Sequence, residues 1–314
     1  MTNRQLTTPV ALFVFNRPHL TEKVFCEIAR ARPPKLLVVA DGPRVNFPND
    51  AEKCASARAV TERVNWECEV YTNYSDLNLG AGRRVSSGLD WAFDIVDKAI
   101  ILEDDCLPDP SFFPFCEELL DKYRDDQRIM AISGNNFQFG RKRTEYSYYF
   151  SRFAHCWGWA SWRRAWKHYD FEMKLWPEIR NEKWLYDLLD DKRAVDYWSR
   201  LFERTYHGYI DAWDYQLVLS AWLQNCLFIM PNVNLVSNIG FGPEATNTKD
   251  PQEKDANVRT EPMIFPISHP PFMMRDSVAD QLDQLNLFTV PPLFLRAINR
   301  LTKLLSSTFR RKNL

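Results

Sequence analysis

The sequence predicts an α/β protein whose mostly parallel sheet is flanked by helices. Between residues 9 and 132, short apolar runs alternate with longer segments in which apolar residues recur at helical spacing. Strands separated by helices of about 10 to 15 residues form βαβ units, whose crossovers place neighbouring strands parallel. The run AIIL at residues 99–102 agrees with this, because a short uninterrupted apolar run is typical of a strand buried on both faces.

Strands and helices are expected in alternation up to residue 133. The strands are apolar runs, and the helices are segments of helical spacing, of which the second is rich in alanine. In chain order we expect a strand at 10–15, a helix at 19–30, a strand at 35–40, a helix at 50–64, a strand at 69–72, a helix at 83–96, a strand at 99–102, a helix at 111–123 and a strand at 129–133.

The pattern changes beyond residue 134, where aromatic residues become dense in EYSYYFSRFAHCWGWASWRRAW. Helical patterns follow up to about residue 224, and a strand-like run occupies 226–230. The next polar segment, SNIGFGPEATNTKD, is rich in turn formers and is a candidate mobile lid.

The last segment, 291–314, is expected to be a separate, basic amphipathic helix. Six lysines and arginines occur there, and no acidic residue follows Asp283. Two interpretations stay open: contact with an anionic membrane surface, or an ordinary helix packed on the domain or frayed from it. The apolar positions at helical spacing are Leu293, Phe294, Ile298, Leu301, Leu305 and Phe309.

Composition excludes some classes of protein. A net charge of −1 over 314 residues argues against a nucleic-acid binder, which needs a basic excess to neutralise phosphates. Seven scattered cysteines without a C-x-x-C pair predict reduced thiols in a cytosolic protein. The apolar run at 9–15 is too short for the apolar region of a signal peptide, and no segment approaches the length of a membrane-spanning helix.

Polar residues suited to nucleotide contacts follow successive expected strands. Asn16 and Arg17 in FNRP end the first, and the arginine offers a planar cation to a phosphate or base. Asp41 in ADGPR ends the second; its carboxylate can accept hydrogen bonds from an imide N–H or from ribose hydroxyls, and Gly42 permits close backbone approach.

The third strand is followed by NLGAGRR. This motif places Asn78 and two glycines before a helix that carries Arg83 and Arg84 at its start, an arrangement suited to an anionic diphosphate. Asp-Gly is usually a turn and Gly-x-Gly usually a loop, but their recurrence at successive strand ends favours a common site.

Three acids, Glu103, Asp104 and Asp105, follow the AIIL strand directly. One interpretation is a solvated turn, with Asp109 capping the next helix near Ser111. The other is a set of oxygen ligands for a divalent cation and a phosphate ester, because open α/β sheets bind ligands beyond the carboxyl ends of their strands.

The set FNRP, ADGPR, NLGAGRR and LEDDCLPDPSFF resembles the nucleotide-sugar half of GT-A fold glycosyltransferases. The acidic triplet with its proline and two phenylalanines is similar to the DxD-type motif of the N-acetylglucosaminyltransferase I group, and the chain also resembles family 2-like bacterial glycosyltransferases. The resemblance covers residues 9–132 most fully. It implies a GT-A (Rossmann-like) domain with a nucleotide-sugar half at 1–133, an acceptor-binding and catalytic half at 134–290, and the tail at 291–314.

The resemblance further implies an inverting transfer of a sugar from a nucleotide-diphosphate donor, a UDP-sugar, to a hydroxyl of a glycan or lipid-linked acceptor in polysaccharide biosynthesis. The enzyme would be cytoplasmic, at the inner face of the membrane where the tail makes contact.

Donor-binding residues would be Asn16, Arg17, Asp41, Asn78 and Arg83. Within the acidic triplet, Asp105 would bind Mn²⁺ or Mg²⁺, Asp104 would reach ribose or donor sugar, and Glu103 would face a sugar hydroxyl. A hard cation on oxygen ligands would neutralise the charge that develops on the diphosphate.

Two segments of the second half carry the remaining expected roles. In GYIDAWDYQ, Asp214 is the expected catalytic base, and Asp211 is the fallback, with a helix N-cap as its structural alternative. In HCWGWASW, Trp157 and Trp159 flank a glycine and could stack on the acceptor sugar. His155 could contact phosphate or fill space, and Trp162 and Trp166, four residues apart, are expected in the core.

One departure from the family concerns the metal. Many GT-A enzymes place a His or Asp near the end of the domain as a second ligand, whereas this chain offers Glu244 and Asn247 there, or His269 further on.

Two other functions remain open from the sequence. A sugar-nucleotide pyrophosphorylase shares the sheet and acids but has a Gly-rich loop after its first strand, and FNRPHL lacks glycine. A non-catalytic carbohydrate-binding protein could keep the fold, but it would have no use for Asp105 and Asp214 together.

Overall fold

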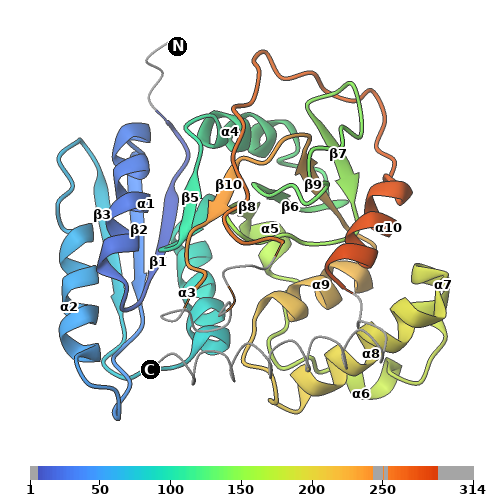
Figure 1. Cartoon of the computed structure of the whole chain (residues 1–314), viewed down its shortest axis with the longest axis horizontal. Coiled ribbons are helices and arrows are strands. Elements are labelled where there is room, and N and C mark those ends of the chain that lie inside the picture. The colour runs from blue at the N-terminus through green and yellow to red at the C-terminus, as the bar shows by residue number, and fades with distance from the viewer. Residues whose placement is uncertain (1–5, 243–249, 251–253, 289–314) are drawn as a thin grey trace, which may run out of the picture.

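The computed structural model describes residues 6–242, 250 and 254–288, which form a central mixed sheet flanked by helices (Figure 1). The eight strands lie in the order β3-β2-β1-β4-β8-β6-β9-β7, and a separate ladder joins β10 to β5. Strand bounds are β1 Val10–Val14, β2 Lys35–Ala40, β3 Glu69–Tyr74, β4 Lys98–Glu103, β5 Cys106–Pro108, β6 Ile129–Ser133, β7 Tyr148–Ser151, β8 Trp159–Trp162, β9 Leu227–Pro231 and β10 Val236–Asn238.

The helices are distributed along the whole described chain. Their bounds are α1 Pro18–Ala31, α2 Asp50–Thr61, α3 Ala81–Ile95, α4 Phe112–Lys122, α5 Arg163–Trp166, α6 Trp176–Ile179, α7 Trp184–Leu189, α8 Lys192–Tyr206, α9 Asp214–Leu223 and α10 Ser277–Asn286.

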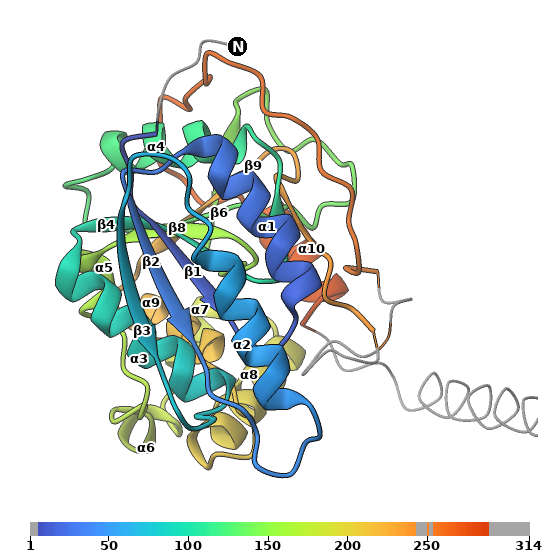
Figure 2. The same cartoon turned by 90° about the vertical axis from the view of Figure 1, so that its left-hand side faces the viewer.

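The alternation predicted for the first half is confirmed. Strands β3, β2, β1 and β4 are mutually parallel, and every residue of β1 is buried, as a central strand covered on both faces requires. Figure 2 shows α1 and α2 on one side of these strands and α3 on the other. The carboxyl ends of β1, β2 and β4 therefore meet at one edge of the sheet.

The sheet is mostly parallel, as predicted, since six of its eight strands run in one direction, but it is not purely parallel. Strand β8 runs antiparallel between β4 and β6, and β7 runs antiparallel to β9. Both β7 and β8 come from the aromatic stretch in which the sequence analysis identified no strand. Every residue of these two strands is buried, so their aromatic side chains pack on the pleated surface that favours them.

A second, smaller core lies among α6 to α9, which gather at one end of the molecule (Figure 1). It is built on stacked and edge-to-face rings, such as Trp198 against Trp222 with centroids 4.8 Å apart. Trp162 and Trp166 lie in the main core, as predicted.

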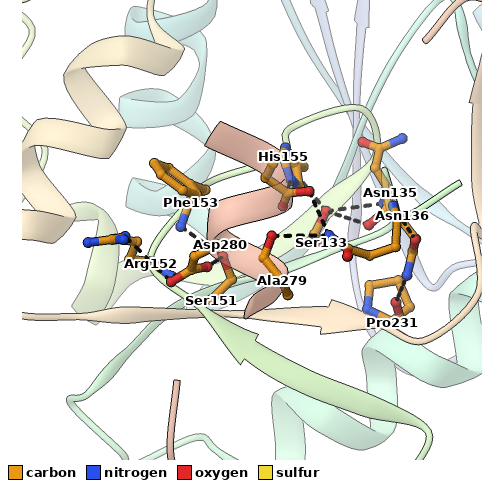
Figure 3. A network of polar contacts seen from close by, with 12 residues as sticks. Ser133, Asn135, Asn136, Ser151, Arg152, Phe153, His155, Pro231, Ala279 and Asp280 are labelled. Carbon is orange, nitrogen blue, oxygen red and sulfur yellow. Dashed lines mark hydrogen bonds and ion pairs between the residues drawn. The ribbon is translucent and has the colours of Figure 1, made fainter. Parts of the chain in front are cut away.

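Helix α10 is attached to the sheet through acids on one of its faces. Asp276 pairs with Arg143, Asp280 accepts from Ser151, and Asp283 pairs with His155. Figure 3 shows the part of this network around Asp280, which lies beside Ser151 and Arg152. Burial raises the pKa of Asp280 to about 6, although the Ser151 hydroxyl and Arg152 act in the opposite direction.

Some predicted features lie outside the described residues, namely the tail at 291–314, Glu244, Asn247 and most of the second half of the candidate lid. Within residues 6–242, 250 and 254–288, no helix has the length and apolar character needed to cross a bilayer.

Candidate active site

A cleft of about 700 Å³ opens at the carboxyl ends of β1, β2 and β4 and is bounded on its other side by segment 209–215. Ligand sites of α/β sheets occur at such an edge. Predicted site residues line it from both halves of the chain: Arg17, Asp41, Asn78, Glu103, Asp104, Asp105, Trp157, Asp211 and Asp214. Asn16, Arg83 and Trp159 do not.

Arg17 holds two of the three acids that follow β4. Its Nη1 donates to Asp105 Oδ2 at 2.8 Å, and its Nη2 contacts Asp104 Oδ1. Asp104 Oδ2 also accepts from the Phe15 amide at 3.3 Å. Burial alone would lower the pKa of Arg17, but attraction to Asp104 and Asp105 is stronger and raises it, so a buried ion triad ends the strand.

Unlike Asp104 and Asp105, the cleft acids Glu103 and Asp214 have no ion-pair partner within the described part of the chain. The Glu103 carboxyl has no hydrogen-bond or ion-pair partner within the described part of the chain, and burial, with the neighbouring Asp105 and Asp104, raises its pKa to about 8. Burial also raises the pKa of Asp214, opposed by amides of the first turn of α9. The cleft thus contains Glu103, whose raised pKa favours its protonated form, and the half-buried carboxyl of Asp214, which is suited to accept a proton.

Asp41 holds its own loop rather than presenting a free carboxylate. Its Oδ1 accepts from the amides of Gly42 and Leu79, both at 2.9 Å, and its Oδ2 accepts from Asn78 Nδ2 and the Gly80 amide. Two carboxylate oxygens have about four acceptor positions, and these four hydrogen bonds occupy them. No position is left for the predicted hydrogen bond from a base or a ribose hydroxyl.

The glycine at position 42 is required by a close contact within the protein. A Cβ on this residue would lie 2.5 Å from the backbone of Leu77, so the close approach expected of a ligand is made by residues 77–79.

Asp211 occupies the amino end of α3, where the sequence predicted a diphosphate. Its carboxylate accepts from the amides of Ala81 at 3.0 Å and Gly82 at 2.8 Å, as a negative charge does at a helix start. A Cβ at Gly80 or Gly82 would lie 2.6 Å from that carboxylate, which explains both glycines. The fallback base is therefore an N-terminal partner of α3.

Arg84, and not Arg83, faces the cleft. Arg83 pairs with Glu172 on the surface, whereas Arg84 donates to Ala40 O at 3.2 Å and to Asn73 O at 2.5 Å, and burial lowers its pKa. Helical periodicity could have found this, because position 84 lies on the buried face of α3 together with Gly88.

Arg44 is a cleft residue that sequence reasoning did not select, although it ends the ADGPR motif. It pairs with Asp50 at 2.7 Å and stacks on the ring of Phe47 at 3.7 Å. Asn16 donates to the same Asp50 at 2.6 Å, and it supports this pair from outside the cleft. The guanidinium carbon of Arg44 also lies 5.3 Å from the centroid of the Phe15 ring, and both residues line the cleft, so a cationic and aromatic wall faces the ligand space.

Trp157 and Trp159, both expected to line a sugar site, lie in different environments. Trp157 lines the cleft and packs edge-on against Phe137, whereas Trp159 is 1% exposed and stacks on Trp213 with centroids 5.4 Å apart. The ring of Trp159 therefore has no free face for a sugar, because its place in β8 points it into the core.

The two histidines considered for phosphate or metal contacts have other partners. His155 pairs with Asp283, and His269 contacts Glu118 and Tyr148. None of their partners lines the cleft, so His269 is not placed to act as a second metal ligand.

Asp105 is suited to hold a divalent cation through one carboxylate oxygen. No three His, Cys, Asp or Glu side chains converge into a metal cage among residues 6–242, 250 and 254–288. Asp105 Oδ1, however, accepts a hydrogen bond only from the Cys106 thiol, at 3.6 Å, among the residues that the structure describes. Mg²⁺-type sites commonly use one or two carboxylates, with substrate phosphates and waters completing the shell. The donor set is suited to a cation that arrives with an anionic substrate.

Comparisons with known proteins add little to this geometry. No protein-family profile matches the chain, and no curated protein is similar to it in sequence. A solved structure of mouse xyloside xylosyltransferase 1 in its apo form matches 68% of this chain and 81% of its own, with 12% identity and a TM-score of 0.34. A likeness of that degree assigns neither fold nor function.

Proposed function

We propose that the protein is a metal-dependent inverting glycosyltransferase that moves a sugar from a nucleotide-diphosphate donor, a UDP-sugar, to a hydroxyl of a glycan or lipid-linked acceptor. One observation carries the proposal. A single cleft at the carboxyl ends of parallel strands combines Asp105, whose Oδ1 accepts from the weakly donating Cys106 thiol, with Glu103 and Asp214, neither of which forms an ion pair within the described residues.

The donor's nucleotide would lie along β1 and β2, against Phe15, Arg44 and Asn78. Its sugar would then reach the end of β4, where Glu103, neutral below pH 8, can donate a hydrogen bond to a sugar hydroxyl. Trp157 provides an aromatic wall on the side of the acceptor.

The charge of the cleft supports a cation requirement. Six acids but only three arginines line it, so a diphosphate entering alone would meet net repulsion. A divalent cation held by Asp105 would supply the neutralisation of the diphosphate leaving group.

Asp214 would act as the base of a direct displacement. The acceptor oxygen attacks the anomeric carbon and forms the new glycosidic bond while the bond from that carbon to the diphosphate oxygen breaks, so the electron pair leaves with the diphosphate. The acceptor's proton passes to the Asp214 carboxylate, whose raised pKa favours proton uptake.

The test combines nucleotide binding with turnover. UDP with Mn²⁺ should raise the unfolding temperature more than UDP with EDTA, and a ligand at 100 times its dissociation constant stabilises by about 2.7 kcal/mol. Asp214→Asn should leave this shift intact and lower sugar transfer by roughly 100-fold or more. Asp196→Asn, a matched change on the exposed part of α8, should alter neither.

Three outcomes would contradict the proposal. Equal UDP affinity with and without metal would show that no cation takes part in donor binding. Full activity of Asp214→Asn would show that Asp214 is not the base. Nucleotide binding without transfer or hydrolysis of any sugar nucleotide would favour the non-catalytic carbohydrate-binding alternative.

A further inference from the structure

The ion triad of Arg17, Asp104 and Asp105 occupies the place that a divalent cation would need. Arg17 Nη1 lies 2.8 Å from Asp105 Oδ2, and the side chains of Arg17, Asp104 and Asp105 are 14%, 3% and 11% exposed. A cation bound to Asp105 would therefore lie close to a guanidinium of like sign in a poorly hydrated place, where charges interact strongly.

The Asp105 side chain has no room to move away from Arg17. Its Oδ2 lies against the backbone of Gly240, where a Cβ would be only 2.2 Å from that oxygen and 2.7 Å from Arg17 Nη1. The Ile239 amide also donates to Asp105 O at 2.8 Å. Arginine keeps its charge at any pH that a folded protein tolerates, so proton loss cannot relieve the repulsion. The remaining movable part is the Arg17 side chain, which lines the cleft.

We propose that Arg17 is the resident counterion of the cation site. It neutralises Asp104 and Asp105 in the free protein, and it leaves Asp105 for the phosphate oxygens of the donor when cation and donor enter together. Its planar fork, which bridges two carboxylates in the free protein, matches phosphate oxygens as well, so the contact with Asp105 can be exchanged for a contact with phosphate. The inference rests on the proposed function for its ligand.

A consequence is that cation and nucleotide bind cooperatively. Mn²⁺ alone must displace Arg17 without offering it a new partner, whereas Mn²⁺ with UDP provides that partner. By linkage, UDP tightens Mn²⁺ binding by the same factor as Mn²⁺ tightens UDP binding.

The experiment measures the affinity of the full chain for Mn²⁺ by electron paramagnetic resonance of the free ion, with and without UDP. In the wild type, UDP should tighten Mn²⁺ binding at least tenfold. In Arg17→Gln, Mn²⁺ alone should bind at least tenfold more tightly than to the wild type, and the further gain from UDP should fall. Arg17→Lys, which keeps the charge but cannot bridge both carboxylates, should lie between the two and serves as the readout where Arg17→Gln does not fold.

Two controls identify the site. Arg44→Gln removes another cleft arginine, paired with Asp50 instead, and should leave the affinity for Mn²⁺ alone unchanged. Adding Asp105→Asn to Arg17→Gln should abolish the gained affinity.

The outcomes separate the two proposals. Mn²⁺ affinities of Arg17→Gln and Arg17→Lys that equal the wild-type value would overturn the counterion role, even where sugar transfer is observed. Absence of sugar transfer in the wild type would overturn the proposed function and leave the order of Mn²⁺ affinities among the variants as evidence for the counterion.

Discussion

Glu103 shows how a single side chain at the end of a buried strand becomes a chemical group with unusual properties. It is followed directly by two carboxylates, and Arg17, which contacts the triplet, is paired with those two and not with Glu103. Its charge is therefore disfavoured both by burial and by Asp105 and Asp104. A strand end optimised for stability would not group acids in this way, so the site carries an electrostatic cost that function would explain.

This cost predicts a pH-dependent gain in stability for Glu103→Gln. The wild-type pKa rises from an ordinary 4.5 when unfolded to about 8 when folded. The folded protein thus holds the proton more tightly, and stability present below pH 4.5 is lost as the pH rises through 8. Relative to wild type, the variant should gain on the order of 2 kcal/mol between pH 5 and pH 9, because partial exposure reduces the full effect of the shift.

Urea unfolding at intervals between these pH values measures the difference. Glu52→Gln, an exposed change in the first turn of α2, should give a difference that does not vary from pH 6 to pH 9. A Glu103→Gln difference that is equally flat would show that Glu103 is already ionised at neutral pH.

At the scale of elements, the start of α3 connects the two halves of the chain. Asp211, from the segment before α9, accepts from the first amides of α3 and thereby fixes the approach of Asp214 to the cleft. The amides at the start of α3, which the sequence predicted to bind the donor's phosphates, thus already donate hydrogen bonds to a carboxylate of the protein itself.

We expect Asp211→Ala to act on stability more than on chemistry. Loss of the carboxylate at this helix start should lower the free energy of unfolding by about 1 kcal/mol. Turnover should fall far less than in Asp214→Asn, because Asp211 does not take the acceptor's proton. Paired measurements of chemical denaturation and sugar transfer decide this, and a loss of turnover as large as that of Asp214→Asn would make Asp211 the base.

The elements that could be predicted are those with distinct periodicity. Strands β1 to β4 and helices α1 to α4 were predicted to within a few residues because apolar runs and helical spacing alternate there. Strands β7 and β8 were not, since a run dense in aromatic residues suits a buried strand or a buried helix equally well. The antiparallel insertion of β8 depends on contacts between β4 and β6 that no local pattern contains.

The site was predicted in its location more than in its details. Strand ends predicted a common site for Arg17 and the acidic triplet, and the family resemblance added Asp214; all of them line one cleft. The hydrogen bonds that saturate Asp41 and the pairing of Arg17 with the acids depend on side chains distant in sequence, up to 88 residues apart for Arg17 and Asp105. Local motifs cannot show such competition between a ligand and the protein's own groups.

At the scale of the molecule, the tail at 291–314 stays a prediction from sequence. Six cations beside an apolar face should hold the catalytic domain on an anionic bilayer, since each Lys or Arg near the surface contributes about 1 kcal/mol and the attraction fades within a Debye length. The full chain should sediment with anionic liposomes in low salt and be released in high salt, whereas a chain truncated after Val290 should stay in the supernatant and retain donor hydrolysis.

Replacement of Arg310, Arg311 and Lys312 by glutamine, which leaves the apolar face intact, is the matched control and should weaken sedimentation without affecting unfolding. If the truncated chain aggregates or loses its cooperative unfolding transition, the tail is instead a structural helix that covers the core.

The attachment of α10 has a consequence for how the chain matures on the ribosome. Ser151 in β7 meets its partner Asp280 only 129 residues later, and β7 lies at the open end of the sheet. At roughly 5 to 20 residues per second, the strand waits about 6 to 26 seconds during synthesis before α10 emerges. Throughout that interval an aromatic edge strand and the buried cation Arg152 lack their acidic partner, and the nascent chain is exposed to edge-to-edge aggregation.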